Sequence, residues 1–151
     1  IRTSWLFSEY GNNFLKTILR LSFERKEIRV VKDQIGSPTY AQDIAKAILI
    51  IIDELKRKKL SSCLYHFAGD KTLSWFEFSN AILNEALELK LIKNKPKIIS
   101  ITTNQFPTDA KRPLRSVLNS SQINTTFGIN SSNCIFGIRS SLIAIKKNQN
   151  L

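Results

Sequence analysis

Apolar residues recur along the chain with two spacings, one typical of strands and one typical of helices. Apolar positions three or four apart predict helices at about residues 14–25, 39–58 and 135–147, a helix that opens at 74–77 and carries apolar residues from 78 to 87, and a shorter helix at 119–127. Short apolar or alternating runs predict strands at about residues 1–7, 28–32, 64–68 and 97–103. Strands that alternate with helices indicate an α/β fold.

Polar residues at the predicted helix starts have the form of caps. Asn13 follows a Gly-Asn turn, and its side chain can accept from the free amides of the first turn. Thr39–Gln42 and Ser74–Glu77 both have the form of a capping box. The spacing also predicts which side chains of three helices face inward, namely Phe14, Ile18 and Leu21; Ile44, Ile48, Ile51, Ile52 and Leu55; and Phe78, Ile82, Leu83, Ala86 and Leu87.

Composition limits the class of protein. A length of 151 residues fits one domain, or one domain and part of another, and 42% hydrophobic residues indicate a globular chain. The longest apolar run, residues 47–52, is too short to cross a membrane. Cys63 and Cys134 form no metal motif, which favours a reduced, cytoplasmic protein without a metal site. Because the chain starts at Ile1 within a predicted strand, we expect an N-terminal portion to be missing.

A net charge of +11 raises the question of nucleic-acid binding. The basic residues are scattered, however, and the one dense run, Lys56–Lys59, ends a predicted helix, where cations offset the helix dipole. A basic nucleic-acid module therefore stays the least favoured alternative, and we expect neither a nucleic acid nor a membrane as partner.

The loops carry five motifs that become informative when they are taken together and in order. They are Arg2–Trp5, Gly11–Phe14, Val30–Thr39, Tyr65–Gly69 and Pro107–Leu118. In this order they resemble the C-terminal half of the dTDP-4-dehydrorhamnose reductase family, within the extended short-chain dehydrogenase/reductases. The resemblance implies that residues 1–27 end a Rossmann-type cofactor-binding domain and that residues 28–151 form a smaller α/β substrate-binding domain.

The same resemblance implies a reaction for the whole enzyme. Members reduce dTDP-6-deoxy-L-lyxo-4-hexulose to dTDP-L-rhamnose, a precursor of polysaccharides, with NADPH or NADH as hydride donor. A Mg²⁺ ion is associated with the family near its dimer interface, but we can assign no ligands for it in this chain. A homodimer is left open, as are the sugar epimer and the choice between NADPH and NADH.

Site residues follow from the matched motifs. Trp5 corresponds to a tryptophan at the mouth of the active site, although a core tryptophan is the alternative. Arg112 offers a forked guanidinium that suits a diphosphate, on a loop that Pro107 and Pro113 stiffen. His66 and Trp75 are interpreted as structural residues.

Further contacts are expected from smaller polar side chains. Asn13 either contacts the diphosphate or only caps its helix, and Gln34 and Ser116 are expected to touch the nucleotide or the sugar. Thr3 and Ser4 are expected to line the nicotinamide side of the pocket.

Two features that catalysis requires are absent from the sequence. The five glycines are too dispersed to form the Gly-rich turn of a dinucleotide site, and no tyrosine is followed four residues later by lysine. We therefore expect no catalytic residue here, an inactive fragment, and exposed apolar surface around residues 5–7 and 14–21. The alternative is a non-catalytic homologue of the type that regulates methionine adenosyltransferase.

Overall fold

The computed structural model describes residues 1–57, 63–108, 110 and 112–148. The fold is α/β, as predicted. Its helices are α1 (Phe14–Glu24), α2 (Ala41–Arg57), α3 (Trp75–Glu88), α4 (Ser121–Phe127) and α5 (Cys134–Asn148), with a 3₁₀ turn at Thr103–Gln105. Its strands are β1 (Leu6–Phe7), β2 (Glu27–Val31), β3 (Ile35–Gly36), β4 (Thr39–Tyr40), β5 (Leu73–Ser74) and β6 (Lys97–Ile101).

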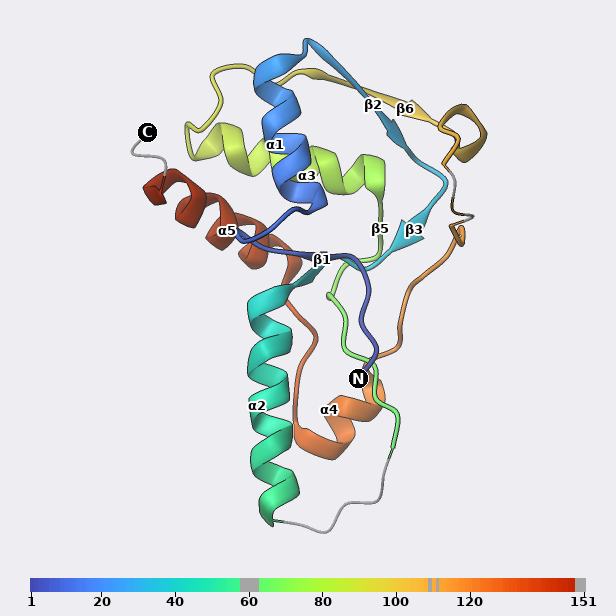
Figure 1. Ribbon diagram of the computed structural model, residues 1–151, viewed down its shortest axis with the longest axis vertical. Helices are drawn as coiled ribbons and strands as arrows, with labels where there is room; N and C mark the ends of the chain where they lie inside the picture. The colour runs from blue at the N-terminus through green and yellow to red at the C-terminus, as the bar shows by residue number, and fades with distance from the viewer. Residues whose placement is uncertain (58–62, 109, 111, 149–151) are drawn as a thin grey trace.

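The strands pair in twos within the described residues. β2 runs parallel to β6, β1 runs parallel to β4, and β3 runs antiparallel to β5. The molecule is elongated, with α1, α3, α5 and the β2–β6 pair at one end and α2 and α4 at the other (Figure 1). The segment at 64–68, predicted as a strand, forms only a parallel bridge between His66 and Arg2.

The larger core lies where α1, α3 and α5 meet. Phe78 of α3 is fully buried, and its ring lies 5.3 Å from that of Phe7 and 5.5 Å from that of Phe14. Ile18 is 2% exposed and Phe7 is 1% exposed, so the surface expected to be open around these segments is largely covered, with Leu6 as the exception. The predicted inward faces of α1 and α3 are confirmed except for Leu87, which is exposed.

A smaller core packs α2 against α4. Ala47 is buried with Phe67, Ile123 and Ile129, and Ile44 and Ile51 pack against this cluster.

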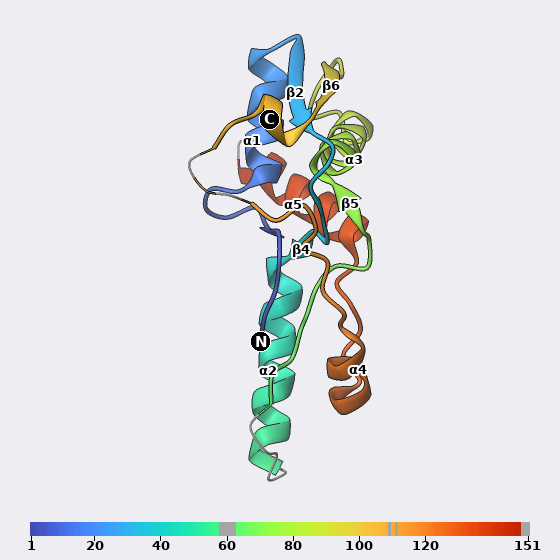
Figure 2. The same ribbon diagram turned by 90° about the vertical axis from the view of Figure 1, so that its right-hand side faces the viewer.

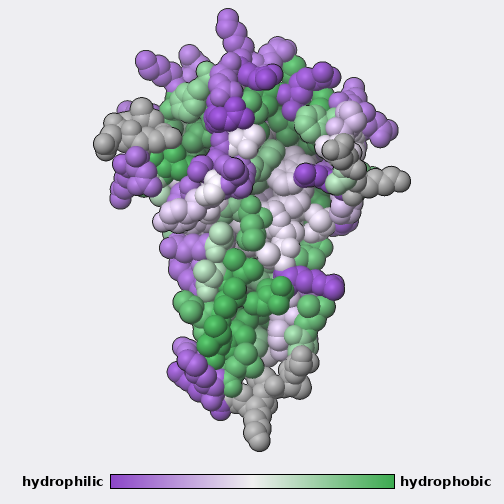
Figure 3. All heavy atoms as spheres, viewed as in Figure 1, coloured by the Kyte–Doolittle hydropathy of each residue, from purple (hydrophilic) through white to green (hydrophobic). Residues whose placement is uncertain are grey.

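The prediction that Ile48, Ile52 and Leu55 also face inward is wrong, since these side chains are 41%, 43% and 51% exposed. One edge of the apolar arc of α2 packs with α4 into the smaller core, whereas the other edge is about half exposed to solvent (Figure 3). Lys58 and Lys59 of the basic run lie outside the described residues.

Local hydrogen bonds explain where two helices begin. Asn13 caps α1 by accepting from the amide of Lys16. Ser74 and Glu77 form the predicted capping box of α3.

The capping box predicted at Thr39 is wrong. Thr39 lies in β4, and its hydroxyl donates to the carbonyl of Ser37 and accepts from the amide of Gly69. A threonine that joins two loops in this way is not available to cap the helix that follows.

Replacing Ser74 by alanine is expected to lower the free energy of unfolding by about 1 kcal/mol at neutral pH, because α3 loses its N-cap. The amide and hydroxyl of Ser74 lower the pKa of Glu77 by donating to its carboxylate. The stability that this lowered pKa contributes is present above the unfolded-state pKa of Glu77 and is lost as the pH falls through its folded-state pKa. Urea titrations should therefore show the Ser74→Ala difference at pH 7 and a smaller one in acid, while the exposed Ser131→Ala changes little at either pH.

Candidate functional site

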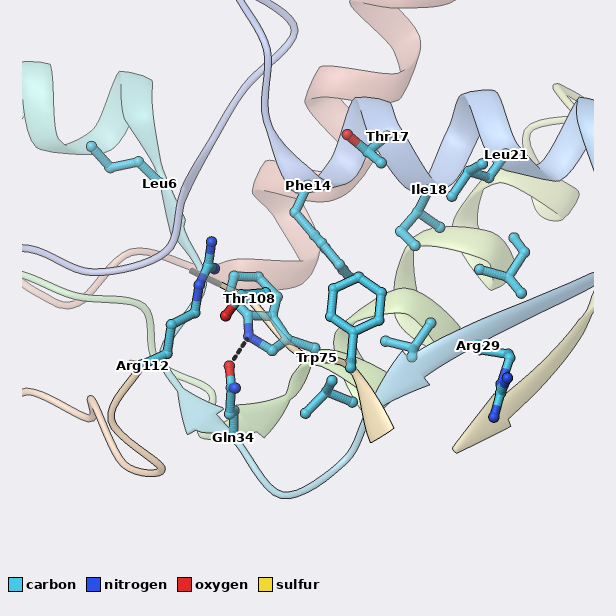
Figure 4. Close-up of a pocket in the computed structure, with 14 residues that line it drawn as sticks. Leu6, Phe14, Thr17, Ile18, Leu21, Arg29, Gln34, Trp75, Thr108 and Arg112 are labelled. Atoms are coloured by element: carbon cyan, nitrogen blue, oxygen red, sulfur yellow. Dashed lines mark hydrogen bonds between the residues drawn. The ribbon is translucent and has the colours of Figure 1, made fainter. Parts of the chain in front are cut away.

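A cavity of about 440 Å³ opens between α1 and β2 (Figure 4). Its volume lies within the range of small-molecule sites, about 300–1,000 Å³. Apolar side chains from the two elements form its walls, and polar side chains from the loops lie at its rim. The apolar group includes Phe14, Ile18, Leu21, Ile28, Val30 and Val31, and the polar group includes Gln34, Thr108 and Arg112.

A chain of hydrogen bonds fixes one wall of the cavity. The indole N–H of Trp75 donates to Gln34 Oε1 over 3.1 Å, the bond drawn in Figure 4. Gln34 Nε2 donates in turn to Thr103 Oγ1 over 3.2 Å. The backbone amide and the hydroxyl of Thr103 both donate to the carboxylate of Asp33. The loop after β2 is thereby tied to the segment after β6, and it holds the Trp75 ring at the cavity.

The carboxylate of Asp33 is stabilised in its charged form. The hydrogen bond from the backbone amide of Thr103 is the main cause that lowers the pKa of Asp33. Asp33 therefore acts as an anchor for the loop and does not line the cavity.

Trp5 lies behind the wall that Trp75 forms. Its backbone is left-handed, with φ of 48°, which is uncommon for a bulky residue. One face of its indole stacks on Trp75, with ring centroids 3.4 Å apart and planes 6° from parallel. A Cβ atom added to Gly36 would lie over the ring, 2.6 Å from Trp5 Nε1, so the glycine backbone covers the other face. Trp75 therefore lines the cavity and Trp5 stacks behind it, and the predicted contact of Trp5 with the substrate stays a prediction.

Arg112 lies at the rim of the cavity, with Gln34 and Trp75 nearby (Figure 4). Its side chain is exposed, which leaves the guanidinium accessible to a ligand at the mouth. Sequence reasoning assigned Arg112 and Gln34, and the structure brings both to this cavity. Trp75, interpreted from the sequence as structural, packs against the larger core and also lines the cavity. Arg29, an exposed residue of β2 that sequence reasoning did not assign, lines it as well.

Asn13 does not line this cavity. Its side chain caps α1 and donates to the carbonyls of Ser8 and Tyr10. Ser116 is also apart from the cavity, and its hydroxyl donates to the carbonyl of Ile35 over 3.4 Å. The predicted ligand contacts of both residues stay predictions.

Ser4 and Thr3 lie in the segment that precedes β1. The hydroxyl of Ser4 donates to the carbonyl of Ser37 over 3.4 Å, and Thr3 Oγ1 is buried without a partner among the described residues. Neither residue lines the cavity between α1 and β2, and their predicted role beside a nicotinamide stays a prediction.

Tyr40 is a buried titratable residue outside this cavity. Burial, followed by the charge of Glu9, raises the pKa of Tyr40 to about 12, which keeps its hydroxyl protonated. Residues 1–57, 63–108, 110 and 112–148 contain no group of three or more His, Cys, Asp or Glu placed to hold a metal ion. Over the same residues, none of the helices combines the length and the apolar character needed to span a bilayer.

Replacing Gln34 by methionine is expected to lower the free energy of unfolding by about 1–3 kcal/mol, since the indole N–H of Trp75 loses its acceptor. The intrinsic fluorescence should shift as well, because the chain has only two tryptophans and they are stacked on each other. Urea denaturation followed by tryptophan emission measures both effects. Gln122→Met, at an exposed glutamine of α4, is the matched control, and equal effects of the two changes would contradict this role for Gln34.

Comparison with known proteins shows the family to which this chain belongs. The family model described as the RmlD substrate binding domain matches residues 1–144. A dTDP-4-dehydrorhamnose reductase of Aggregatibacter actinomycetemcomitans is 45% identical over 133 residues, which cover 87% of this chain and 45% of the relative. The enzyme of the same name from Escherichia coli K12 is 34% identical over 128 residues, covering 85% of this chain and 43% of the relative.

Solved structures agree with the sequence matches. A dTDP-4-dehydrorhamnose reductase of Bacillus anthracis in complex with NADP superposes with a TM-score of 0.75 at 35% identity, covering 95% of this chain and 46% of that one. The Clostridium acetobutylicum counterpart superposes with a TM-score of 0.81 at 32% identity, covering 96% and 48%. The chain thus spans less than half the length of these relatives.

Proposed function

Because the chain belongs to the RmlD substrate binding domain family, we propose that it is the substrate-binding part of a dTDP-4-dehydrorhamnose reductase. In that role it holds dTDP-6-deoxy-L-lyxo-4-hexulose while the 4-keto group is reduced to give dTDP-L-rhamnose. The observation that carries this proposal is the cavity between α1 and β2, at which Gln34, Trp75 and Arg112 meet.

The lining of the cavity suits the two chemically different parts of such a substrate. The apolar walls from α1 and β2 favour the flat faces of a thymine ring, whose hydrogen-bonding groups lie at its edges. Arg112 at the rim offers a planar, forked donor to the diphosphate, where charge-assisted bonds are strongest. The sugar then lies beyond the rim.

The residues of this chain do not fit a dinucleotide. Its glycines are dispersed, and it lacks a tyrosine followed four residues later by lysine. We assign the Gly-rich dinucleotide turn and the proton donor to the part of the relatives' polypeptide that this chain does not match. The contribution of this chain is to bind and orient the sugar nucleotide.

A chimeric reductase tests this function. The part of the Aggregatibacter actinomycetemcomitans relative that precedes its match would be joined to Ile1 of this chain. We expect NADPH oxidation that depends on the dTDP-4-dehydro sugar, and none with this chain alone. A chimera that folds and binds NADPH but does not turn over the sugar nucleotide would contradict the proposal.

A further inference from the structure

Phe106 is an exposed aromatic residue at the mouth of the cavity between α1 and β2. It lines the cavity together with Arg112, yet it is 54% exposed. The ring contacts of the cavity wall join Trp75 to Trp5 and to Phe14. Among the residues that the structure describes, no ring contact includes Phe106. A ring that is more than half exposed at a cavity keeps apolar surface available for a ligand.

The backbone that carries the Phe106 ring is held in place by the loop after β2. The amide of Phe106 donates to the carbonyl of Thr103 over 3.0 Å. The amide and the hydroxyl of Thr103 donate in turn to the carboxylate of Asp33, over 2.9 Å and 2.8 Å. Gln105 Oε1 accepts from the amide of Thr102 over 2.9 Å within the same turn. A side chain on a turn that is already ordered loses less conformational entropy when a ligand packs against it.

The segment that carries this turn also carries Arg112. Figures 1 and 2 show the segment leaving β6 and continuing to α4. It is anchored a second time at β3, where the amide of Ile35 donates to the carbonyl of Leu114 over 2.8 Å. The two anchors, Asp33 and Ile35, are only two residues apart in the sequence. One short stretch of chain thereby presents an aromatic and a cationic side chain at the same rim.

The two rim side chains suit different parts of a nucleotide. The guanidinium of Arg112 can pair with a diphosphate. A phenyl ring offers a flat apolar face, which suits the face of a base but would leave the charge of a diphosphate unpaired. Stacking of a base on an aromatic side chain is also tolerant of the identity of the base, because every base has a π-face.

We propose, resting on the proposed function, that Phe106 stacks on the base of the bound nucleotide. Asp33 is then a positioning residue, because it fixes Thr103 and, through Thr103, the amide of Phe106. Since stacking accepts any pyrimidine, Phe106 contributes affinity and does not choose between thymine and uracil.

Calorimetric titration of dTDP, UDP and thymidine into this chain and its variants tests the contact. Phe106→Ala should weaken the binding of all three ligands by the same factor, about tenfold or more. Phe106→Leu keeps apolar volume without a flat ring and should lose most of this affinity, whereas Phe106→Tyr should keep it. Because Phe106 is exposed, urea denaturation should show that these variants are as stable as the unchanged chain.

Phe23→Ala is the matched control. Phe23 lies on α1, is 59% exposed and does not line the cavity, so its replacement should leave all three affinities unchanged. Arg112→Ala should weaken the binding of dTDP and UDP but not of thymidine, which has no diphosphate.

A double-mutant cycle tests the positioning role of Asp33. Asp33→Ala should weaken dTDP binding severalfold while Phe106 is present, and it should have little effect in the Phe106→Ala background. Asp33→Asn keeps an acceptor oxygen for Thr103 and should retain most of the affinity. Equal losses in the two backgrounds would show that Asp33 supports the loop in general, and would overturn its role through Phe106.

The inference and the proposed function can fail separately. Binding of dTDP that Phe106→Ala leaves unchanged would overturn the inference and leave the function. A loss for dTDP and UDP without a loss for thymidine would place the ring outside the nucleoside and overturn the inference as well. If the unchanged chain binds neither dTDP nor thymidine and the chimera does not turn over the sugar nucleotide, the proposed function is removed and the inference with it.

Discussion

Replacing Phe78 by alanine is expected to lower the free energy of unfolding by about 3–5 kcal/mol, the cost typical of removing a buried phenylalanine ring. Phe78 is 0% exposed and lies between the rings of Phe7 and Phe14. The substitution would leave a void in the larger core and remove the contact between Phe78 of α3 and Phe14 of α1. Since α1 forms one wall of the ligand cavity, a loss of nucleotide binding should accompany the loss of stability.

Urea denaturation followed by circular dichroism measures this effect. Phe136→Ala, at a phenylalanine of α5 that is 58% exposed, is the matched control and should change stability by less than about 0.5 kcal/mol. Similar losses from the two substitutions would show that the aromatic contacts around Phe78 are not central to the fold.

Replacing Arg112 by alanine is expected to weaken dTDP binding by about 10–100-fold. A hydrogen bond to a charged group contributes about 1.5–3 kcal/mol, and each 1.4 kcal/mol is a factor of ten in affinity. Arg112→Lys should restore part of the affinity, because an ammonium keeps the charge but not the forked geometry. Calorimetric titration of dTDP into each variant gives the dissociation constants.

Arg115→Ala supplies the control for charge. Arg115 is exposed and lies three residues from Arg112, but it does not line the cavity. If both alanine variants weaken dTDP binding equally, the effect belongs to the net charge of the loop and not to a contact made by Arg112.

The sequence predicted the helices well because their determinants are local. The spacing of apolar residues located α1, α3 and α5, and the side chains of Asn13 and Ser74 marked two starts. Periodicity gives the width of an apolar arc, but not which part of it meets a neighbour. For this reason the exposure of Ile48 and Ile52 on α2 could not be predicted.

The sequence predicted a residue of the candidate site only where that residue belongs to a matched motif. Arg112 and Gln34 belong to matched motifs and line the cavity. Trp75 packs against the larger core, as interpreted from the sequence, and its second role as a wall of the cavity had no sequence signal. The left-handed backbone of Trp5 and the contact of its ring with Gly36 are tertiary features without a local signal. The division after residue 27 stays a prediction, and α1 shares the larger core with α3 and α5.

Calorimetric titration of dTDP into this chain and its Thr17→Trp variant tests most directly whether the nucleotide occupies the cavity between α1 and β2. Thr17 is exposed and lines that cavity, so an indole there would fill it without disturbing the core. We expect saturable binding at one site in the unchanged chain, loss of binding in Thr17→Trp, and normal binding in the control Thr125→Trp on α4. Unchanged affinity in Thr17→Trp, or no binding to the unchanged chain, would contradict a nucleotide site in this cavity.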